Sequence, residues 1–175
     1  MNDKIRVLLS EEEVAKRIKE MGEVISSDYE GRPLHLICIL KGGVFFTCEL
    51  AKRISLPLTL DFMSVSSYGA GTVSSGIVKI VKDLDEPIEG KDVLIVEDII
   101  DSCNTLSYLI EVLKQRNPRS IELCTLLDKP ERRVKKQVTV KYTCFTVPDQ
   151  FIVGYGLDYD QKYRNLPYIG VIEQQ

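Results

Sequence analysis

Two short runs of apolar residues limit the folds open to this chain of 175 residues. They cover residues 34–40 (LHLICIL) and 92–96 (DVLIV). An unbroken apolar run of this length is typical of a strand buried on both faces, as in a parallel sheet that helices cover on both sides. Segments with helical spacing of apolar residues alternate with these strand-like segments. The sequence therefore predicts an α/β fold with a mainly parallel sheet.

Capping and turn residues predict the remaining elements. Ser10 and Glu13 have the spacing of a capping box, and apolar residues follow at helical spacing, which predicts a helix over 11–27. We expect further helices over 44–54 and 106–115, and further strands over 58–65, 77–81, 120–127 and 138–145. Because no shift in composition marks a boundary, we interpret residues 1–175 as a single domain.

The composition excludes several classes of protein. With 44% hydrophobic and 28% charged residues, the chain is not expected to be intrinsically disordered, since disordered chains are poor in apolar residues. A formal net charge of −3 argues against a bulk electrostatic grip on nucleic acid or on an anionic membrane surface. No secretory signal is recognisable, and no apolar run approaches the roughly 20 residues of a membrane span. We therefore expect a cytoplasmic protein without a nucleic-acid or membrane partner.

The five cysteines form no metal-binding pattern. They include no CxxC pair, and the chain has one histidine, so a zinc site is not expected. We interpret Cys38, Cys48, Cys124 and Cys144 as free, mostly buried thiols of a reducing compartment. Cys103 lies in a different kind of segment.

Residues 93–106 (VLIVEDIIDSCNTL) carry the most informative pattern. The apolar strand leads into Glu97 and Asp98, then into a short polar turn and a predicted helix. Ligands of open α/β sheets bind beyond the carboxyl ends of the strands, and the N-terminus of a helix suits a phosphate. Ser102 and Thr105 add hydroxyl donors, and the two carboxylates could hold sugar hydroxyls or a divalent cation.

A purely structural interpretation of the same turn stays open at this point. Asp101, Ser102 or Asn104 could serve only as a cap of the following helix, because all three residue types favour the N-cap position. This interpretation does not explain Glu97 and Asp98, which stand at the end of a strand, where a capping role is not available.

The segment resembles the phosphoribosyl-diphosphate (PRPP) binding signature of type I phosphoribosyltransferases, and its EDIID form resembles their hypoxanthine-guanine branch. Other blocks resemble the same family in the same order, over about residues 34–172. They are 40–43 (LKGG), like its pyrophosphate loop; 66–69 (SSYG), like the start of its flexible catalytic loop; 126–129 (LLDK), like its purine-reading segment; and 148–159 (PDQFIVGYGLDY), like its base-stacking and metal segment, with Arg164 downstream. The resemblance implies the type I phosphoribosyltransferase fold, in which helices flank a mainly parallel central sheet, with a small hood and a flexible catalytic loop.

The resemblance also implies an activity. Members of the family transfer the 5-phosphoribosyl group of PRPP to N9 of hypoxanthine or guanine in purine salvage, which gives IMP or GMP and pyrophosphate. We thus expect a pentosyltransferase, within the glycosyltransferases, that uses Mg²⁺ and forms a homodimer or homotetramer. The preference among hypoxanthine, guanine and xanthine stays open.

By the same resemblance, the residues of the informative segment have expected roles toward PRPP and the proton. Asp101 would lie beside N7 of the purine and accept its proton. Backbone N–H groups of the following residues would wrap the 5′-phosphate, namely those of Ser102, Cys103, Asn104 and Thr105. Glu97 and Asp98 would hold the ribose hydroxyls and shape the magnesium site, and Asp158 would coordinate a magnesium bound to pyrophosphate.

The resemblance assigns two further groups. Lys41, Gly42 and Arg164 would bind pyrophosphate. At the turn that contains Lys41 and Gly42, the family uses an unusual cis peptide bond. Ser67 and Tyr68 would close over the site and exclude water.

The purine would meet another set of residues. Lys129 would donate a hydrogen bond to O6, which favours a 6-oxo group over the 6-amino group of adenine. Phe151 would stack on the base, and the backbone around Ile152 would meet its other edge.

Cys103 departs from the family pattern, which has glycine at this position. If the backbone needs a positive φ here, a cysteine costs about 1–2 kcal/mol, and its thiol would crowd the 5′-phosphate. We expect weaker PRPP binding than in the glycine form, with the chemistry retained. A second hypothesis is a redox-sensitive thiol whose pKa the helix N-terminus lowers.

Two other functions stay open. The fold is reused by PRPP- or nucleotide-sensing regulators, but these are expected to carry a DNA-binding domain or a basic face, and they do not need Asp101, Lys129 and Phe151 together. A transferase for adenine, uracil or orotate is the other alternative. Lys129 and the EDIID form favour a 6-oxopurine over these bases.

Overall fold

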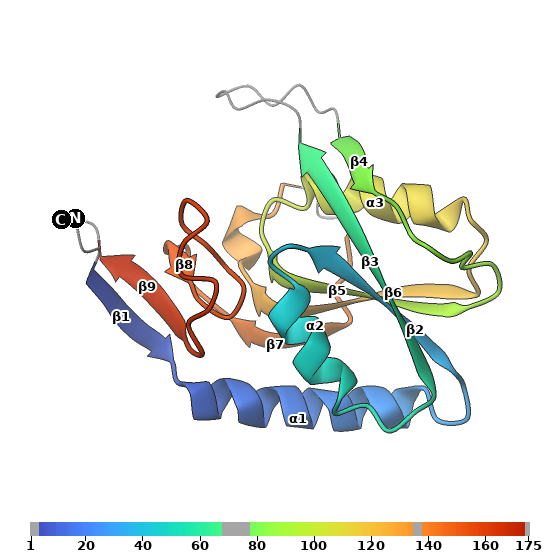
Figure 1. Cartoon of the computed structure of the whole chain (residues 1–175), viewed down its shortest axis with the longest axis horizontal. Coiled ribbons are helices and arrows are strands. Elements are labelled where there is room, and N and C mark those ends of the chain that lie inside the picture. The colour runs from blue at the N-terminus through green and yellow to red at the C-terminus, as the bar shows by residue number, and fades with distance from the viewer. Residues whose placement is uncertain (1–3, 68–77, 135–137, 174–175) are drawn as a thin grey trace.

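A six-stranded sheet forms the centre of the molecule (Figure 1). The computed structural model describes residues 4–67, 78–134 and 138–173. The strands of the sheet follow the order β4-β3-β2-β5-β6-β7, and all neighbours are parallel except the antiparallel pair β3 and β4. Their bounds are β2 Leu34–Leu40, β3 Leu58–Ser67, β4 Val78–Lys82, β5 Asp92–Ile100, β6 Ser120–Asp128 and β7 Tyr142–Thr146.

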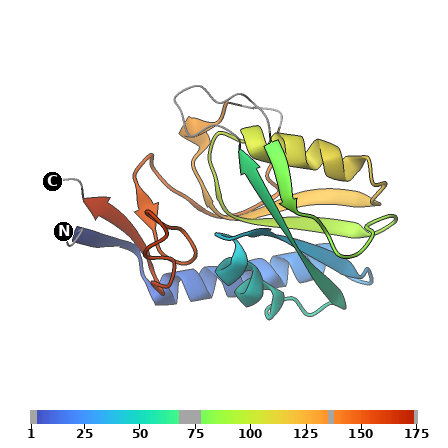
Figure 2. The same cartoon turned by 45° about the horizontal axis from the view of Figure 1, so that its top comes forward.

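Helices cover both faces of this sheet, as Figure 2 shows. Two of them, α1 (Glu11–Asp28) and α2 (Val44–Ala51), lie on one face, and α3 (Asn104–Lys114) lies on the other. Alternate residues of each central strand face opposite sides. Leu94 packs on the side of α1 and α2, whereas Ile95 packs on the side of α3. Because both faces are dry, nearly all residues of these runs are apolar, and His35 and Asp92 are the exceptions within them.

Local signals define the first helix. The Ser10 side chain accepts from the backbone N of Glu13, and Glu13 Oε2 accepts from the backbone N of Ser10 at 2.7 Å, so the expected capping box is present. The apolar stripe of α1 is buried, as its spacing predicts; its members are Val14, Ile18, Met21 and Ile25. The predicted helix over 11–27 is therefore confirmed, with one more residue at its end.

A second, smaller sheet is built from both ends of the chain. Its order is β1-β9-β8, with β1 at Lys4–Leu9, β8 at Ile152–Val153 and β9 at Ile169–Glu173. In Figure 1 this small sheet lies beside the large one, on the side where β2 ends. It is the hood that the family resemblance implied. The periodicity of the sequence predicts none of its three strands, because they are short and irregularly patterned.

Several predicted bounds are wrong. The strand over 92–96 continues through the two acids to Ile100, and the strand over 138–145 begins only at Tyr142. The helix over 44–54 ends at Ala51, and the helix over 106–115 begins earlier, at Asn104. Within the part of the chain that the structure describes, no helix is long and apolar enough to cross a membrane.

The cysteine prediction is confirmed at three of its four positions. Cys38, Cys124 and Cys144 are free and buried, but Cys48 is exposed on α2. The prediction is wrong there because Cys48 lies on the face of α2 turned away from the sheet, whereas Phe46 and Leu50 are among the residues that α2 buries.

Candidate active site

Three parallel strands end side by side at one edge of the large sheet. β5 lies between β2 and β6, with Cys38 opposite Val96 and Ile100 opposite Asp128. The residues that follow these strands thus meet at one edge, although they lie far apart in the sequence. The edge collects the loop after β2, the turn after β5 and the segment that begins at Lys129.

The turn between β5 and α3 forms a small hollow. A cavity of about 170 Å³ is lined by Glu97 and residues 99–106. The first turn of α3 has backbone N–H groups without helical partners, which suits an anion in this hollow. The segment after β6 contacts this turn, because the Val134 backbone N donates a hydrogen bond to the Ser102 carbonyl at 3.2 Å.

The capping interpretation of this turn is not supported. The N-cap of α3 is Cys103, and its side chain makes no capping hydrogen bond. Neither Asp101 nor Ser102 stands at the cap position, and Asn104 is already the first residue of the helix. The polar residues of the turn therefore remain available for a ligand.

Cys103 has the backbone conformation that the family usually fills with glycine. Its φ is 65°, in the left-handed region, which costs a residue with a β-carbon about 1–2 kcal/mol. The side chain is 5% exposed and packs with Ile100 and Leu106 in the core under α3. This packing does not support the expected crowding of a phosphate by the thiol, so the strained backbone is the cost that remains.

The expectation of an acidic thiol is wrong. Burial raises the pKa of Cys103, and the nearby Arg133 guanidinium offsets this only in part. The charges of Asp128 and Asp101 raise the pKa of this thiol further. A thiol is easily oxidised when it is partly exposed and ionised, and Cys103 does not meet that condition.

Glu97 and Asp98 lie near the end of strand β5, beside the cavity. Burial raises the pKa of Glu97 well above its usual range, and the neighbouring charge of Asp98 adds to this. Burial likewise raises the pKa of Asp98 to about 6, against the hydrogen bond that Oδ1 accepts from the Ile99 backbone N at 2.9 Å. Two desolvated carboxylates side by side are poised to take a cation or to accept from hydroxyl groups.

The loop after β2 lies directly against these acids. A β-carbon at Gly42 would collide with the Asp98 carboxylate, so any larger residue would displace that side chain. The peptide bond between Leu40 and Lys41 is cis, at the turn where the family resemblance implied such a bond. A β-carbon at Gly156, in the loop after β8, would collide with the Gly42 carbonyl oxygen. The hood loop and the loop after β2 therefore form one wall.

Arg164 holds this hood loop together. Its Nη1 donates to the Gly156 carbonyl at 2.7 Å, and its Nη2 lies 2.9 Å from Asp158 Oδ1. Gln161 joins the group, because its side-chain oxygen accepts from Arg164 Nη2 at 3.3 Å and from Lys41 Nζ at 3.4 Å. Two cations from distant parts of the chain thus converge on one point, which is the arrangement that a pyrophosphate needs.

Lys129 follows β6 and is almost buried, at 8% exposure. Its backbone N donates to the Ile100 carbonyl at 2.9 Å, and its Nζ donates to the Gln150 carbonyl at 2.6 Å. Phe151 follows Gln150 in the sequence, and its side chain is 47% exposed. The ring of Tyr159 lies edge-on to the ring of Phe151, with 5.2 Å between the ring centroids. Phe151 is therefore no core aromatic, and Ile152 behind it is buried in β8.

Sequence reasoning missed three residues that hold this site. They are Arg132, Asp149 and Gln161. Arg132 Nε donates to Asp101 Oδ1 at 3.2 Å, and Asp149 Oδ1 lies 3.7 Å from Lys129 Nζ. Gln161 accepts the hydrogen bonds from Lys41 and Arg164 that are described above. Their residue types are common on protein surfaces, so only their position inside or just after the matched blocks could have singled them out.

The expected lid lies mostly outside the described residues. Ser67 is the last residue of β3, and Tyr68 falls in the range 68–77, which the structure does not describe.

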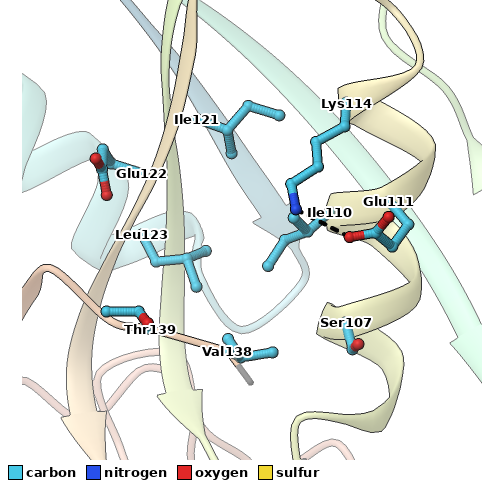
Figure 3. A pocket seen from close by; sticks show the side chains of 9 residues that line it. All are labelled: Ser107, Ile110, Glu111, Lys114, Ile121, Glu122, Leu123, Val138 and Thr139. Atoms are coloured by element: carbon cyan, nitrogen blue, oxygen red, sulfur yellow. Dashed lines mark hydrogen bonds and ion pairs between the residues drawn. The ribbon is translucent and has the colours of Figure 1, made fainter. Parts of the chain in front are cut away.

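A separate cavity of about 340 Å³ lies between α3 and β6 (Figure 3). Its lining includes aliphatic side chains and the Lys114–Glu111 ion pair at 3.0 Å, and it brings no predicted site residue together.

Comparison with known proteins agrees with this geometry. The sequence model of the phosphoribosyl transferase domain matches residues 6–160. The hypoxanthine-guanine phosphoribosyltransferase of Bacillus subtilis is 54% identical over 168 residues, which cover 96% of this chain and 93% of that protein. The enzyme of the same name from Streptococcus thermophilus is 51% identical over 97% of this chain and 94% of that protein.

The chain belongs to the hypoxanthine-guanine phosphoribosyltransferase family.

Solved structures of this family confirm the fold. A hypoxanthine phosphoribosyltransferase from Staphylococcus aureus has a TM-score of 0.92 and 50% identity, covering 96% of this chain and 91% of that one. A hypoxanthine-guanine phosphoribosyltransferase from Bacillus anthracis, with a HEPES molecule in its active site, has a TM-score of 0.93 and 45% identity, covering 98% and 100%. Family membership favours the transferase interpretation of the sequence over the regulator.

Some relatives are longer than this chain. The bifunctional protein TilS/HprT of Listeria monocytogenes is 51% identical over 174 residues, which are 99% of this chain but 27% of that protein. The domain of the phosphoribosyltransferase family therefore also occurs joined to other protein segments.

Proposed function

We propose that the chain is a purine-salvage transferase that moves the 5-phosphoribosyl group of PRPP to N9 of hypoxanthine or guanine, with release of pyrophosphate. One observation carries the proposal most directly. The backbone N of Lys129 donates to the carbonyl of Ile100 at 2.9 Å, so the lysine and Asp101 leave adjoining strand ends together. A donor for O6 and an acceptor for the N7 proton need this proximity, because the two atoms neighbour each other on a 6-oxopurine.

PRPP would lie along the edge of the large sheet. Its 5′-phosphate fits the hollow between β5 and α3, where Ser102, Asn104 and Thr105 offer backbone N–H groups and polar side chains. The two acids near the end of β5 would accept hydrogen bonds from the ribose hydroxyls. The leaving pyrophosphate would then point toward the wall formed by the loop after β2 and the hood loop.

The chain's own cations would neutralise the leaving group. Lys41 and Arg164 both reach Gln161, and a pyrophosphate placed between them would accept from both. Gly42 allows this approach because its lack of a side chain keeps the loop against Asp98. As the bond from C1′ to pyrophosphate lengthens, negative charge grows on the leaving oxygens, and these cations stabilise it.

The purine would be held from three sides. Phe151 presents an exposed aromatic ring for stacking, and the backbone at Ile152 would meet the remaining edge of the base. The Lys129 ammonium, already a donor to the Gln150 carbonyl, has further N–H groups for O6. As N9 attacks C1′, the proton on N7 becomes more acidic and passes to the Asp101 carboxylate.

The acids fit a magnesium ion only in part. Among residues 4–67, 78–134 and 138–173, no group of three His, Cys, Asp or Glu residues is arranged to hold a metal. Mg²⁺, however, commonly takes one or two carboxylates and fills its other positions with substrate phosphates and water. Glu97, Asp98 and Asp158 would supply such carboxylates, and a bound Mg²⁺ would neutralise charge on the diphosphate.

The remaining features belong to the same proposal. Ser67 and Tyr68 would begin a lid that excludes water from the reacting C1′. The protein would act in the cytoplasm as a single-domain subunit of a homodimer or homotetramer. A sedimentation measurement of the purified chain would distinguish these assemblies from a monomer.

An assay with four bases tests the function. The purified chain is incubated with PRPP, Mg²⁺ and one of hypoxanthine, guanine, xanthine or adenine, and nucleotide and pyrophosphate are both measured. We expect product with hypoxanthine, guanine or both, and little with adenine. If none of the four bases gives a nucleotide, the proposal is refuted. If adenine alone gives a product, the proposed role of Lys129 as a donor to O6 is refuted.

A further inference from the structure

An arginine lies between two carboxylates at the candidate site. Arg132 ends the short 3₁₀ helix η1 (Pro130–Arg132), and its Nε donates to Asp101 Oδ1 at 3.2 Å. Its Nη1 donates to Asp149 Oδ2, also at 3.2 Å. The other oxygen of Asp149 lies 3.7 Å from Lys129 Nζ. The four side chains therefore form one row of alternating charge, in the order Lys129, Asp149, Arg132 and Asp101.

This row joins three segments that are anchored separately. Asp101 follows β5, the lysine and arginine follow β6, and Asp149 lies in the connection from β7 to β8. The ion pairs are too exposed to matter much for stability, since the side chains of Arg132, Asp101 and Asp149 are 52%, 42% and 41% exposed. What the row can do is fix the positions of its members.

The chemistry of a guanidinium suits this task. Its planar fork of N–H groups can hold two carboxylates at once in a defined geometry, which an ammonium group cannot. The bond to Arg132 occupies only part of the acceptor capacity of Asp101, so the carboxylate can still receive a proton. At the other end of the row, Asp149 and the Gln150 carbonyl orient Lys129 and leave it a donor for a ligand.

We propose that Arg132 and Asp149 are positioning residues that hold the Asp101 carboxylate and the Lys129 ammonium in register for the purine. This inference rests on the transferase function proposed above. Neither residue needs to touch the purine or PRPP; each acts through the group that it holds. A displacement of a reacting group by about 1 Å can cost about a hundredfold in rate, so such support has a measurable effect.

A double-mutant cycle tests the inference. We compare the wild type with Arg132→Gln, with Asp149→Asn and with the double variant, and measure kcat/KM for hypoxanthine and KM for PRPP. Each single change should lower kcat/KM about tenfold, the equivalent of one charge-assisted hydrogen bond, and leave KM for PRPP within about twofold. Because both residues act through one row, the double variant should also lose about tenfold, not about a hundredfold.

Two further variants sharpen the cycle. Arg132→Lys keeps the charge but cannot bridge two carboxylates, so it should restore only part of the lost activity. Arg116→Gln is the matched control, because Arg116 forms a comparable pair with Asp83 at 2.7 and 2.9 Å, away from the site. Its activity should equal that of the wild type.

The outcomes separate the two proposals. Single variants within about twofold of the wild type, or losses that multiply in the double variant, would overturn the positioning role while the transferase function stands. A wild type that transfers to no base would instead refute the function on which this inference rests.

Discussion

Gly156 lies so close to Gly42 that a β-carbon on Gly156 would collide with the Gly42 carbonyl oxygen. Gly156 also has a φ of +103°, which residues with side chains rarely adopt. The hood loop and the loop after β2 thus meet backbone against backbone. This contact brings Arg164 from the hood to the same place as Lys41, and both side chains donate to Gln161.

Replacing Gly156 by alanine should separate these loops. We expect Gly156→Ala to lower the free energy of unfolding by about 2–4 kcal/mol, because backbone strain and a backbone collision add together. KM for PRPP should rise at the same time. Gly31→Ala is the control, since Gly31 has a φ of +75° but a β-carbon there would meet no atom within 4 Å. If both variants lose the same stability in a urea titration, the contact is not what requires glycine.

Burial of the ionised Asp98 carboxylate should lower the free energy of unfolding of the unliganded protein above about pH 6. Its raised pKa, about 6, means that the folded chain holds a proton which the unfolded chain releases near pH 4. The stability associated with this group is therefore complete below about pH 4 and is lost as the pH rises through about 6. Asp98→Asn should raise the free energy of unfolding at pH 8, without Mg²⁺, by about 1–2 kcal/mol, allowing for partial exposure, and should change it little at pH 4.

Asp83 provides a control of opposite sign. Its hydrogen bonds from Arg116 lower its pKa, so Asp83→Asn should destabilise the protein at pH 8. Equal effects of the two substitutions in urea titrations would contradict the assignment of burial as the main influence on Asp98.

The five thiols should react in a defined order. Cys48 is exposed, whereas burial raises the pKa of Cys38 to about 11 and that of Cys144 to about 12. We expect one fast equivalent in a titration with an aromatic disulfide reagent, and its loss in Cys48→Ser. Cys103 should react slowly, because its thiol is buried and its pKa is raised. A fast equivalent that persists in Cys48→Ser would reopen the hypothesis of a reactive thiol in the phosphate loop.

Cys103→Gly should tighten PRPP binding. Glycine adopts a φ of 65° without strain, so the loop conformation that would bind the phosphate costs less free energy with glycine than with cysteine. We expect the dissociation constant for PRPP to fall several-fold, with kcat little changed. Calorimetric titration of both proteins would measure this, and an unchanged dissociation constant would show that the cysteine is tolerated without a cost in binding.

The sequence predicted the strands and helices that carry strong local signals. Leu34–Leu40 has the predicted bounds, because an almost wholly apolar run that lies between turn residues begins and ends at clear signals in the sequence. Ser10 and Glu13 defined the start of α1 for a similar local reason. The end of β5 was predicted too early, because charged residues normally end a buried strand, whereas β5 continues through Glu97 and Asp98 to Ile100.

Other features depend on the tertiary structure and have no local signal. In the hood, β1 pairs with β9, although the two strands lie near opposite ends of the sequence. The pattern of neither segment predicts this pairing. Arg132 and Asp149 likewise meet only because β6 and β7 are neighbours. The candidate site was found because family motifs mark the residues that would touch the ligands, whereas residues that only support them carry no such mark.

The role of Asp101 gives the most direct test of the proposed chemistry. We compare the wild type with Asp101→Asn, which keeps the size of the side chain but cannot accept a proton, in the formation of IMP from PRPP, Mg²⁺ and hypoxanthine. The wild type should form IMP and pyrophosphate in equal amounts, and kcat of the variant should fall about 10²–10⁴-fold. Equal kcat values for the two proteins would contradict the proton-accepting role at the centre of this mechanism.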